Sequence, residues 1–169
     1  MIVLVGFMGA GKTSVGARLA RRLGMPFVDV DKAIEAAEGR RIATIFSESG
    51  EAAFRTIERD TVAAALAGDD AVVALGGGAV EDDQTRQRLA AHTVIHLAVD
   101  LATVRRRVGD DRRRPMLQTH DVEALFARRV PVYSSVADHT VVTDGRAPDV
   151  IVDEIIAALP AAGEGTAHA

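Results

Sequence analysis

The segment GFMGAGKT at residues 6–13 constrains the fold of this chain more than any other feature of its sequence. It fits the pattern G-x-x-x-x-G-K-[ST] in full, directly after an apolar run at 2–6 and directly before a helical pattern at 13–24. Glycines let the backbone curl so that successive N–H groups point at phosphate oxygens, and the N-terminus of the following helix adds positive potential. The sequence therefore predicts a strand–loop–helix unit that binds a nucleoside triphosphate.

The residues of this loop have predictable roles. Lys12 would reach the β- and γ-phosphates, and the hydroxyl group of Thr13 would ligate Mg²⁺. The alternative is a glycine-rich turn with an incidental lysine, which the complete motif between a strand and a helix disfavours. The residues of the loop and the following helix that are expected to bind ATP are Gly9, Ala10, Gly11, Lys12, Thr13 and Ser14.

Strand and helix patterns alternate along the rest of the chain. Apolar strands are expected at 2–6, 26–30, 71–75, 93–98 and 139–143. Helices are expected at 13–24, at 31–67 with breaks near Gly39 and Gly50, and at 82–91, 100–108, 121–135 and 148–159. Short apolar strands separated by helices favour an α/β fold with a parallel sheet covered on both faces, in which ligands lie beyond the carboxyl ends of the strands.

Composition narrows the class of protein. The length of 169 residues fits one domain, and 48% hydrophobic residues with 26% charged residues is an ordinary composition for a soluble protein. No apolar run approaches the ~20 residues needed to span a bilayer, and the N-terminus has neither a basic leader nor a cleavage site. We therefore expect a cytoplasmic protein without a membrane partner.

Cysteine, histidine and charge exclude further classes of site. The absence of cysteine excludes disulfides and thiolate metal sites, and the five histidines lack metal-ligand spacing. The formal net charge of −4 argues against a nucleic-acid partner. Positive charge is nevertheless clustered in Arg105–Arg107 and Arg112–Arg114, which indicates a small anionic ligand.

Two features separate this chain from other classes of nucleotide-binding protein. It has no N-K-x-D segment with which a GTPase reads guanine, and its apolar run VVAL at 72–75 ends in glycines rather than in an acid. An ATP-driven motor or switch usually has an acid at the end of such a strand and is longer. The sequence thus favours a phosphotransferase that acts on a small acceptor.

Acids follow the second expected strand instead, in FVDVD at 27–31. Strand alternation would place Asp29 and Asp31 on the same side at the carboxyl end of this strand. One carboxylate would hold Mg²⁺ through water while the other meets the acceptor hydroxyl group. The alternative for Asp31 is that it caps a helix starting at Lys32.

The glycines that follow VVAL are then expected to serve the acceptor. Gly76–Gly78 offer N–H groups without side-chain bulk, so a carboxylate or hydroxyl group can approach the backbone. The alternative is a flexible turn before the helix at 82.

Several segments occur in an order that resembles the shikimate kinase family: GFMGAGKTSVG, FVDVDKAIE, SGEAAFRTIE, VVALGGGAV, RRRPML and FARRVPVY. The likeness runs from Ile2 to about Leu159 and implies a P-loop kinase of the nucleoside-monophosphate-kinase fold. That fold is a three-layer α/β/α arrangement with a five-stranded parallel sheet in the order 2-3-1-4-5, helices on both faces and a lid loop. The implied reaction transfers the γ-phosphate of ATP, with Mg²⁺, to the 3-hydroxyl group of shikimate in the chorismate pathway to aromatic amino acids.

The resemblance also implies roles on the acceptor side. Asp31 would bind the shikimate hydroxyl groups and act as the base, while Arg55 and Arg129 would hold the carboxylate. Glu58, three residues after Arg55, is placed to orient it, although Arg55 taken alone could equally be a surface arginine. Further contacts with the acceptor are expected from the glycine turn and from apolar walls: Gly76, Gly77, Gly78, Met8, Phe46 and Phe54. Core packing would equally explain the two phenylalanines.

The resemblance identifies RRRPML as part of a mobile lid at about 109–119. Spacing alone leaves open which arginine of 112–114 contacts the transferring phosphate, and the family pattern selects Arg114. Arg107, Arg146 and Pro148 match positions near adenine. One position departs from the family, because Ser134 follows Tyr133 where a basic residue is common.

The expected organisation is one domain at 1–159 with an acceptor-binding helical region at about 31–60 and a disordered tail at 160–169. We expect a monomer whose partners are shikimate and ATP. Two alternatives stay open at this point. One is a gluconate-kinase-like sugar-acid kinase of the same fold, and the other is a nucleotide-binding module without catalytic activity, although Lys12, Asp31, Arg114 and Arg129 are all present.

Overall fold

A parallel sheet forms the centre of the molecule. The computed structural model describes residues 1–108 and 122–160. The strands are β1 (Ile2–Val5), β2 (Phe27–Asp29), β3 (Val72–Ala74), β4 (Thr93–Ala98) and β5 (His139–Val142). They form a five-stranded sheet in the order β2-β3-β1-β4-β5, and every neighbouring pair is parallel. The sheet and strand order implied by the sequence are confirmed.

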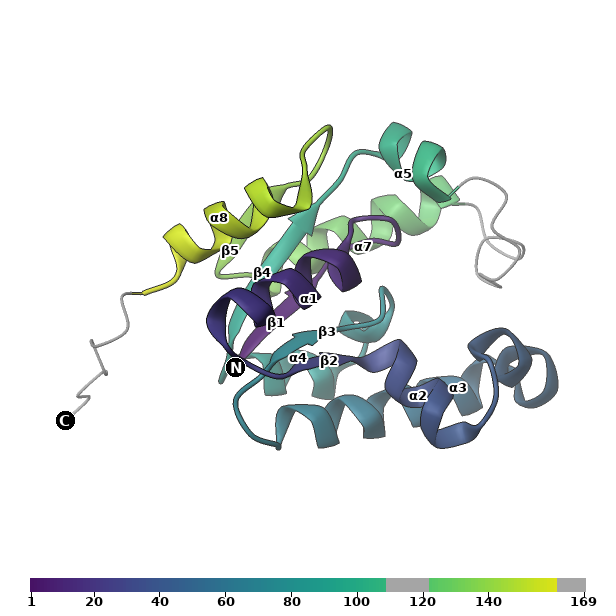
Figure 1. Cartoon of the computed structure of the whole chain (residues 1–169). Coiled ribbons are helices and arrows are strands. Elements are labelled where there is room, and N and C mark those ends of the chain that lie inside the picture. The colour runs from purple at the N-terminus through teal and green to yellow at the C-terminus, as the bar shows by residue number, and fades with distance from the viewer. Residues whose placement is uncertain (109–121, 161–169) are drawn as a thin grey trace.

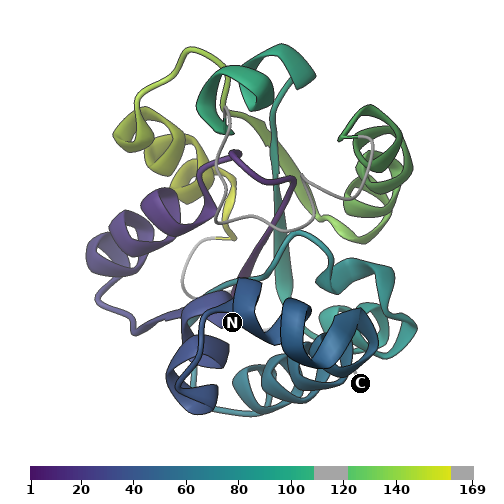
Figure 2. The same cartoon turned by 90° about the vertical axis from the view of Figure 1, so that its right-hand side faces the viewer.

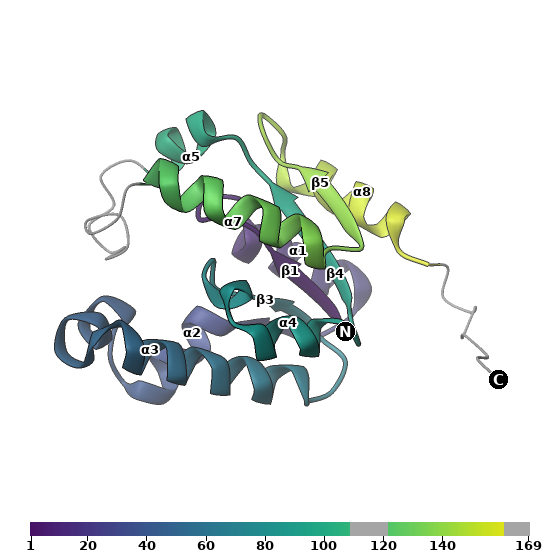
Figure 3. The same cartoon turned by 180° about the vertical axis from the view of Figure 1, so that it is seen from behind.

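Helices cover both faces of this sheet. Helices α1 (Lys12–Leu23) and α8 (Pro148–Ala158) lie on the face turned toward the viewer in Figure 1. Helices α4 (Asp83–Leu89) and α7 (Val122–Val136) lie on the opposite face, which Figure 3 shows. Figure 2 shows the sheet between these two layers. The three-layer α/β/α architecture is therefore also confirmed.

The remaining helices lie toward the ends of the sheet. Helices α2 (Val30–Glu38) and α3 (Ile42–Leu66) pack against each other beside β2, and α5 (Leu101–Val108) follows β4 (Figure 1). The predicted breaks in this region are present, because Gly39 ends α2 in the left-handed region and Gly50 has a non-helical φ of 80° within α3. Among the described residues, no helix is both long and apolar enough to cross a membrane.

The burial of the strands follows from their place in the sheet. All residues of β1 and β3 are buried, because these inner strands have neighbours on both sides and helices on both faces. The edge strand β5 is only partly buried, and its Val142 is 51% exposed. The buried strands β1 and β3 lead at their carboxyl ends into the phosphate loop and the glycine turn.

Two local expectations need correction. Strand β2 ends at Asp29 and helix α2 begins at Val30, so Asp31 lies in the first helical turn and strand alternation does not place it. The cap of α2 is Asp29, whose carboxylate accepts a hydrogen bond from the backbone N–H of Lys32 at 3.2 Å. The helix expected at 82–91 is present as α4, and a short 3₁₀ helix η1 (Ala79–Glu81), which the sequence did not predict, precedes it after the glycine turn.

Candidate active site

The phosphate loop has the predicted strand–loop–helix geometry. Gly9 and Gly11 have φ values of 80° and 95°, which favour glycine, and α1 begins directly afterwards at Lys12. At Gly6 a Cβ atom would lie 2.5 Å from the carbonyl oxygen of Leu97, so a side chain does not fit there. The Lys12 ammonium group donates hydrogen bonds to the carbonyl oxygens of Gly6 at 2.7 Å and Phe7 at 3.1 Å. Its positive charge therefore lies over the loop that would hold phosphates.

Thr13 and Asp29 form the candidate Mg²⁺ site. The Thr13 hydroxyl group donates a hydrogen bond to Asp29 Oδ2 at 2.6 Å. A hydroxyl group and a carboxylate are the oxygen ligands that Mg²⁺ prefers, and this ion is commonly held by one or two such groups together with substrate phosphates and water. No group of three or more His, Asp or Glu side chains among the described residues could hold a metal ion. The pair therefore fits an ion that binds together with a nucleotide.

A cavity of about 260 Å³ connects the phosphate loop with Asp29, at the end of β2, and Asp31, at the start of α2. It opens at the carboxyl ends of the inner strands, where ligands bind in parallel sheets. It is lined by Met8, Gly9, Gly11, Lys12, Thr13, Ser14, Asp29, Asp31, Ala74 and Leu75. Asp29 and Asp31 thus face the same cavity, as the sequence predicted, although a helical turn rather than a strand carries Asp31.

The glycine turn is closely packed by side chains of other elements. A Cβ atom at Gly76 would lie 2.7 Å from carboxylate oxygens of both Asp31 and Glu58, and one at Gly78 would overlap the guanidinium group of Arg55. Neither glycine has a positive φ, so a side chain here would be opposed by the neighbouring side chains, which would have to move, and not by the backbone conformation. Side chains of Asp31, Glu58 and Arg55 therefore occupy the space that side chains of the turn would otherwise fill.

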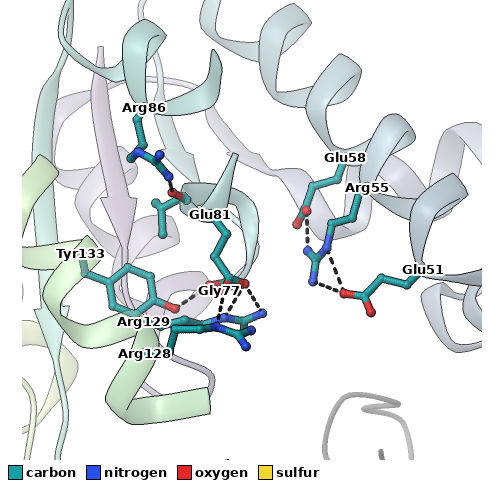
Figure 4. A network of polar contacts seen from close by, with 10 residues as sticks. Glu51, Arg55, Glu58, Gly77, Glu81, Arg86, Arg128, Arg129 and Tyr133 are labelled. Carbon is teal, nitrogen blue, oxygen red and sulfur yellow. Dashed lines mark hydrogen bonds and ion pairs between the residues drawn. The ribbon is translucent and has the colours of Figure 1, made fainter. Parts of the chain in front are cut away.

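Arg55 is held on two sides by acids of its own helix. Its Nη1 donates to Glu58 Oε2 at 2.6 Å, and its Nη2 donates to Glu51 Oε1 at 3.1 Å (Figure 4). Glu58 is 3% exposed, and burial raises its pKa above the usual value although the Arg55 charge opposes this effect. The Asp31 charge raises the pKa of Glu58 further. The orienting contact expected for Glu58 is present.

Arg129 is the other guanidinium expected to hold a carboxylate, and it is 2% exposed in α7. Its Nε donates to Glu81 Oε2 at 2.8 Å, and Arg128 Nε donates to Glu81 Oε1 at 2.8 Å. Figure 4 shows this cluster across from Arg55. Burial raises the pKa of Glu81, but the two arginines outweigh it and lower that pKa below the usual value. The sequence reasoning missed Glu81, because only the tertiary structure brings it to Arg129.

Tyr133 is a second residue that the sequence reasoning did not assign. Its hydroxyl group donates to the carbonyl oxygen of Gly77 at 2.5 Å, and its buried position raises its pKa. Its ring lies 5.3 Å from the ring of buried His96, centroid to centroid. Burial, and then the Lys12 charge, lowers the pKa of His96, which keeps this imidazole neutral at neutral pH. Tyr133 thus ties α7 to the middle of the glycine turn.

The residues expected near the nucleotide base lie around β5 and α8. Arg107 donates to the carbonyl oxygens of Gly9 at 3.0 Å and Thr143 at 2.8 Å, so it lies beside the phosphate loop. Arg146 contacts the carbonyl oxygen of Val142 at 2.9 Å and Glu154 at 2.5 Å. Pro148 is the first residue of α8.

The apolar wall residues and the lid complete the candidate set. Phe46 and Phe54 pack against each other with ring centroids 4.6 Å apart and ring planes tilted by 37°, and the Arg55 guanidinium lies 5.4 Å from the Phe54 ring centroid. Ala10 is buried within the loop, while Ser14 is exposed and accepts a hydrogen bond from Arg18 at 2.7 Å. The expected lid at 109–119, including Arg114, lies outside the described residues, as does the expected tail beyond Pro160.

Comparison with known proteins identifies one family. The family model described as "Shikimate kinase" matches residues 8–160. A shikimate kinase of Thermobifida fusca is 46% identical over 167 residues, covering 97% of both chains. One of Salinispora tropica is 50% identical over 161 residues, covering 94% of this chain and 96% of the relative.

Solved structures agree with these sequence relatives. A shikimate kinase of Acinetobacter baumannii in complex with shikimate superposes with a TM-score of 0.88 at 36% identity, covering 92% of this chain and 89% of that chain. A deoxyadenosine kinase of M. mycoides has a TM-score of 0.61 at 16% identity over 93% of this chain and 97% of its own, which extends the likeness at the level of the fold.

Proposed function

The chain belongs to the shikimate kinase family, and from this premise we propose that its site transfers the γ-phosphate of ATP to the 3-hydroxyl group of shikimate. It is a phosphotransferase with an alcohol group as acceptor, and its cofactors are ATP and Mg²⁺. The products are ADP and shikimate 3-phosphate, an intermediate of aromatic amino acid biosynthesis. The observation that carries the proposal is one cavity lined by both Lys12 and Asp31, which brings a phosphate-binding loop beside a candidate acceptor base.

The donor side of the proposed site comprises residues 6–14 with Asp29. Phosphoryl transfer passes through a loose transition state, so the protein mainly aligns the reactants and offsets their charge. Lys12 would offset charge on the β- and γ-phosphates, and backbone N–H groups of Gly9–Ser14 would hold their oxygens. Thr13 and Asp29 would hold Mg²⁺, which supplies further positive charge to the phosphates when bound.

The nucleotide base would lie beside Arg107, Arg146 and Pro148, because these residues surround the loop after β5 near the phosphate loop. Arg114 is proposed from the RRRPML motif alone as the cation that contacts the transferring phosphate. The lid role of 109–119 has the same basis.

The acceptor side comprises Asp31, Arg55, Glu58, Gly76–Gly78, Glu81 and Arg129. Asp31 lines the cavity and would orient the acceptor hydroxyl group and accept its proton. Arg55 and Arg129 lie on opposite sides of the glycine turn and would hold the shikimate carboxylate from two directions (Figure 4). Phe46 and Phe54 would line the acceptor-binding helical region at about 31–60.

We further propose that one chain is sufficient for activity. Every candidate residue of the donor and acceptor sides comes from the single domain at 1–159, which supports a monomeric enzyme. We assign this reaction to the cytoplasm, where ATP is available to it.

A coupled assay of ADP release tests the proposal. The protein is incubated with ATP and Mg²⁺ and with shikimate, gluconate, quinate or no acceptor. Release that depends on shikimate supports the proposal, whereas release with gluconate alone would keep the fold and contradict the acceptor assignment. A folded protein that binds ATP but releases ADP with no acceptor-dependent increase would contradict the enzymatic function itself.

A further inference from the structure

The buried guanidinium group of Arg129 needs a negative partner. Its side chain is 3% exposed, and a guanidinium group stays protonated in proteins, so burial without a partner would be costly. In the part of the chain that the structure describes, Glu81 supplies this partner, with its Oε2 atom 2.8 Å from Nε and 2.6 Å from Nη2. Glu81 therefore makes a buried Arg129 possible before any acceptor binds.

Glu81 does not satisfy the whole guanidinium group. Both short contacts of Arg129 go to one carboxylate oxygen, Oε2, and only the Nε contact has the geometry of a hydrogen bond. The Nη2 atom is shut off from solvent and has no hydrogen-bond partner among the described residues. A buried donor without a well-aligned acceptor is uncommon and unfavourable, so the position of Nη2 depends on its ion pair with Glu81.

The Glu81 carboxylate is itself fixed from the other side. Arg128 donates to its Oε1 atom at 2.8 Å, and the backbone N–H of Glu81 donates to the carbonyl oxygen of Gly78 at 2.9 Å. Gly78 is the residue against which the Arg55 guanidinium packs. Glu81 thus connects Arg129 to the same turn that limits the position of Arg55, as Figure 4 illustrates.

We propose that Glu81 is a positioning residue for the acceptor carboxylate. Its Oε2 atom holds both Nε and Nη2 of Arg129, and its backbone N–H donates to Gly78, the residue against which Arg55 packs, so that Glu81 sets the position of Arg129 relative to Arg55. Glu81 acts through Arg129 and does not touch the reacting atoms. This role rests on the proposed function, since it takes the shikimate carboxylate as the group that Arg129 holds.

Steady-state kinetics of Glu81→Ala and Glu81→Gln test this role. With ATP and Mg²⁺ saturating and shikimate varied, Glu81→Ala should raise the KM for shikimate about tenfold, because Arg129 loses a charge-assisted hydrogen bond that orients it. The kcat should stay within about twofold and the KM for ATP should not change, since Glu81 does not line the cavity at the phosphate loop. Glu81→Gln keeps an oxygen acceptor for Nε, so its KM should lie between those of Glu81→Ala and the parent protein.

Asp83→Ala is the matched control. Asp83 is an exposed acid two residues along the chain that pairs with Arg86 rather than with Arg129, so its loss should leave the KM for shikimate unchanged. An NMR measurement reports the contact between Arg129 Nε and Glu81 without turnover. The Nε–H resonance of Arg129 is the one that disappears from the ¹⁵N spectrum in Arg129→Lys. This resonance should move in Glu81→Ala and stay in place in Asp83→Ala.

The outcomes separate this role from the proposed function. A parent protein without shikimate-dependent ADP release would overturn the proposed function and, with it, the assignment of Glu81 to this acceptor. An active parent whose KM for shikimate is unchanged in Glu81→Ala would overturn the role of Glu81 alone. A lower KM in Glu81→Ala would also overturn it, because Glu81 would then compete with the acceptor for Arg129.

Discussion

The donor side and the acceptor side of this site are built in different ways. On the donor side, one contiguous segment supplies most of the contacts, and its geometry follows from glycine backbone angles and the start of α1. On the acceptor side, the side chains come from α2, α3, η1 and α7 and meet at the glycine turn after β3. The donor side is thus local in sequence, whereas the acceptor side depends on tertiary packing.

This difference has an energetic consequence. The positive groups that face the phosphate loop are backbone N–H dipoles and Lys12, whose ammonium group donates to carbonyl oxygens of the loop itself. The acceptor side contains arginines paired with Glu51, Glu58 and Glu81. Removing one partner of such a pair leaves the other as a buried or half-buried charge without a counter-charge, which is destabilising. Substitutions on the donor side should therefore mainly affect turnover, while those of the acceptor-side arginines and their paired glutamates should affect substrate affinity and stability together.

The largest effect is expected from Lys12→Ala on the donor side. Loss of a cation that offsets charge on the transferring group should lower kcat about 10²- to 10³-fold, while the KM for shikimate changes little. ADP release at saturating substrates measures this change. Lys32→Ala, an exposed lysine of α2, is the control. Equal losses of kcat and of shikimate affinity in Lys12→Ala would contradict the separation of the two sides.

Asp31→Asn should give the next largest effect, because it removes the proposed base from the acceptor side. General base catalysis typically contributes 10²- to 10⁴-fold, so we expect kcat to fall by about 10²-fold or more. The variant should still bind ATP, as measured by calorimetric titration. Full transfer activity in Asp31→Asn would mean that Asp31 is not the base.

The same difference explains how much the sequence could predict. The phosphate loop, the parallel sheet and the breaks at Gly39 and Gly50 depend on local motifs and backbone preferences, and they were predicted. Asp31 was assigned to the cavity for an incorrect local reason, because propensity does not fix where β2 ends and α2 begins. The position of a helix start within a V-D-V-D segment depends on the Asp29 cap, which only the structure shows.

Glu81 and Tyr133 escaped prediction for a different reason. Each makes its hydrogen bond with a residue more than forty positions away in the sequence, Glu81 with Arg129 and Tyr133 with Gly77. Neither belongs to a recognisable local motif. The 3₁₀ turn that carries Glu81 was also not expected. A glycine run followed closely by an acid, together with paired arginines later in the chain, was the available signal, but no rule of spacing joins them.

Alanine substitutions in the glycine turn should give an intermediate effect and sharpen the packing explanation. Gly76→Ala and Gly78→Ala place a methyl group against Asp31, Glu58 or Arg55, so the free energy of unfolding should fall by roughly 1–3 kcal/mol. In Gly77→Ala the nearest atom lies at 3.6 Å, an ordinary contact, so the loss should be under about 1 kcal/mol. Urea unfolding without ligands measures all three. Equal losses in all three variants would contradict the packing explanation.

The pH dependence of stability should differ in sign between two acids of the acceptor side. The pKa of Glu81 is lowered in the folded state, so its contribution exists above its unfolded pKa and disappears as pH falls through the folded pKa. The stability difference between the parent protein and Glu81→Gln should therefore shrink as pH falls from neutral into the acid range.

Glu58 should behave in the opposite way. Burial and Asp31 raise its folded pKa despite Arg55 and Arg129, so its contribution is complete below its unfolded pKa and is lost as pH rises through the raised value. Glu58→Gln should thus gain stability relative to the parent protein as pH rises over that interval. Unfolding curves at several pH values test both signs, and the same slope for both variants would contradict the different environments assigned to them.

The smallest effect is expected from Arg128→Ala, which tests how firmly Glu81 must be held. The Arg128 side chain is 59% exposed, and exposed ion pairs contribute about 0–1 kcal/mol, so the KM for shikimate should rise only about two- to threefold. Combining Arg128→Ala with Glu81→Ala should add nothing further, because the contact of Arg128 with the site runs through Glu81. Steady-state kinetics of the two single variants and the double variant measure this. Additive effects would mean that Arg128 acts on the acceptor by a route of its own, and the acceptor side would then contain a third cation that works independently of Glu81.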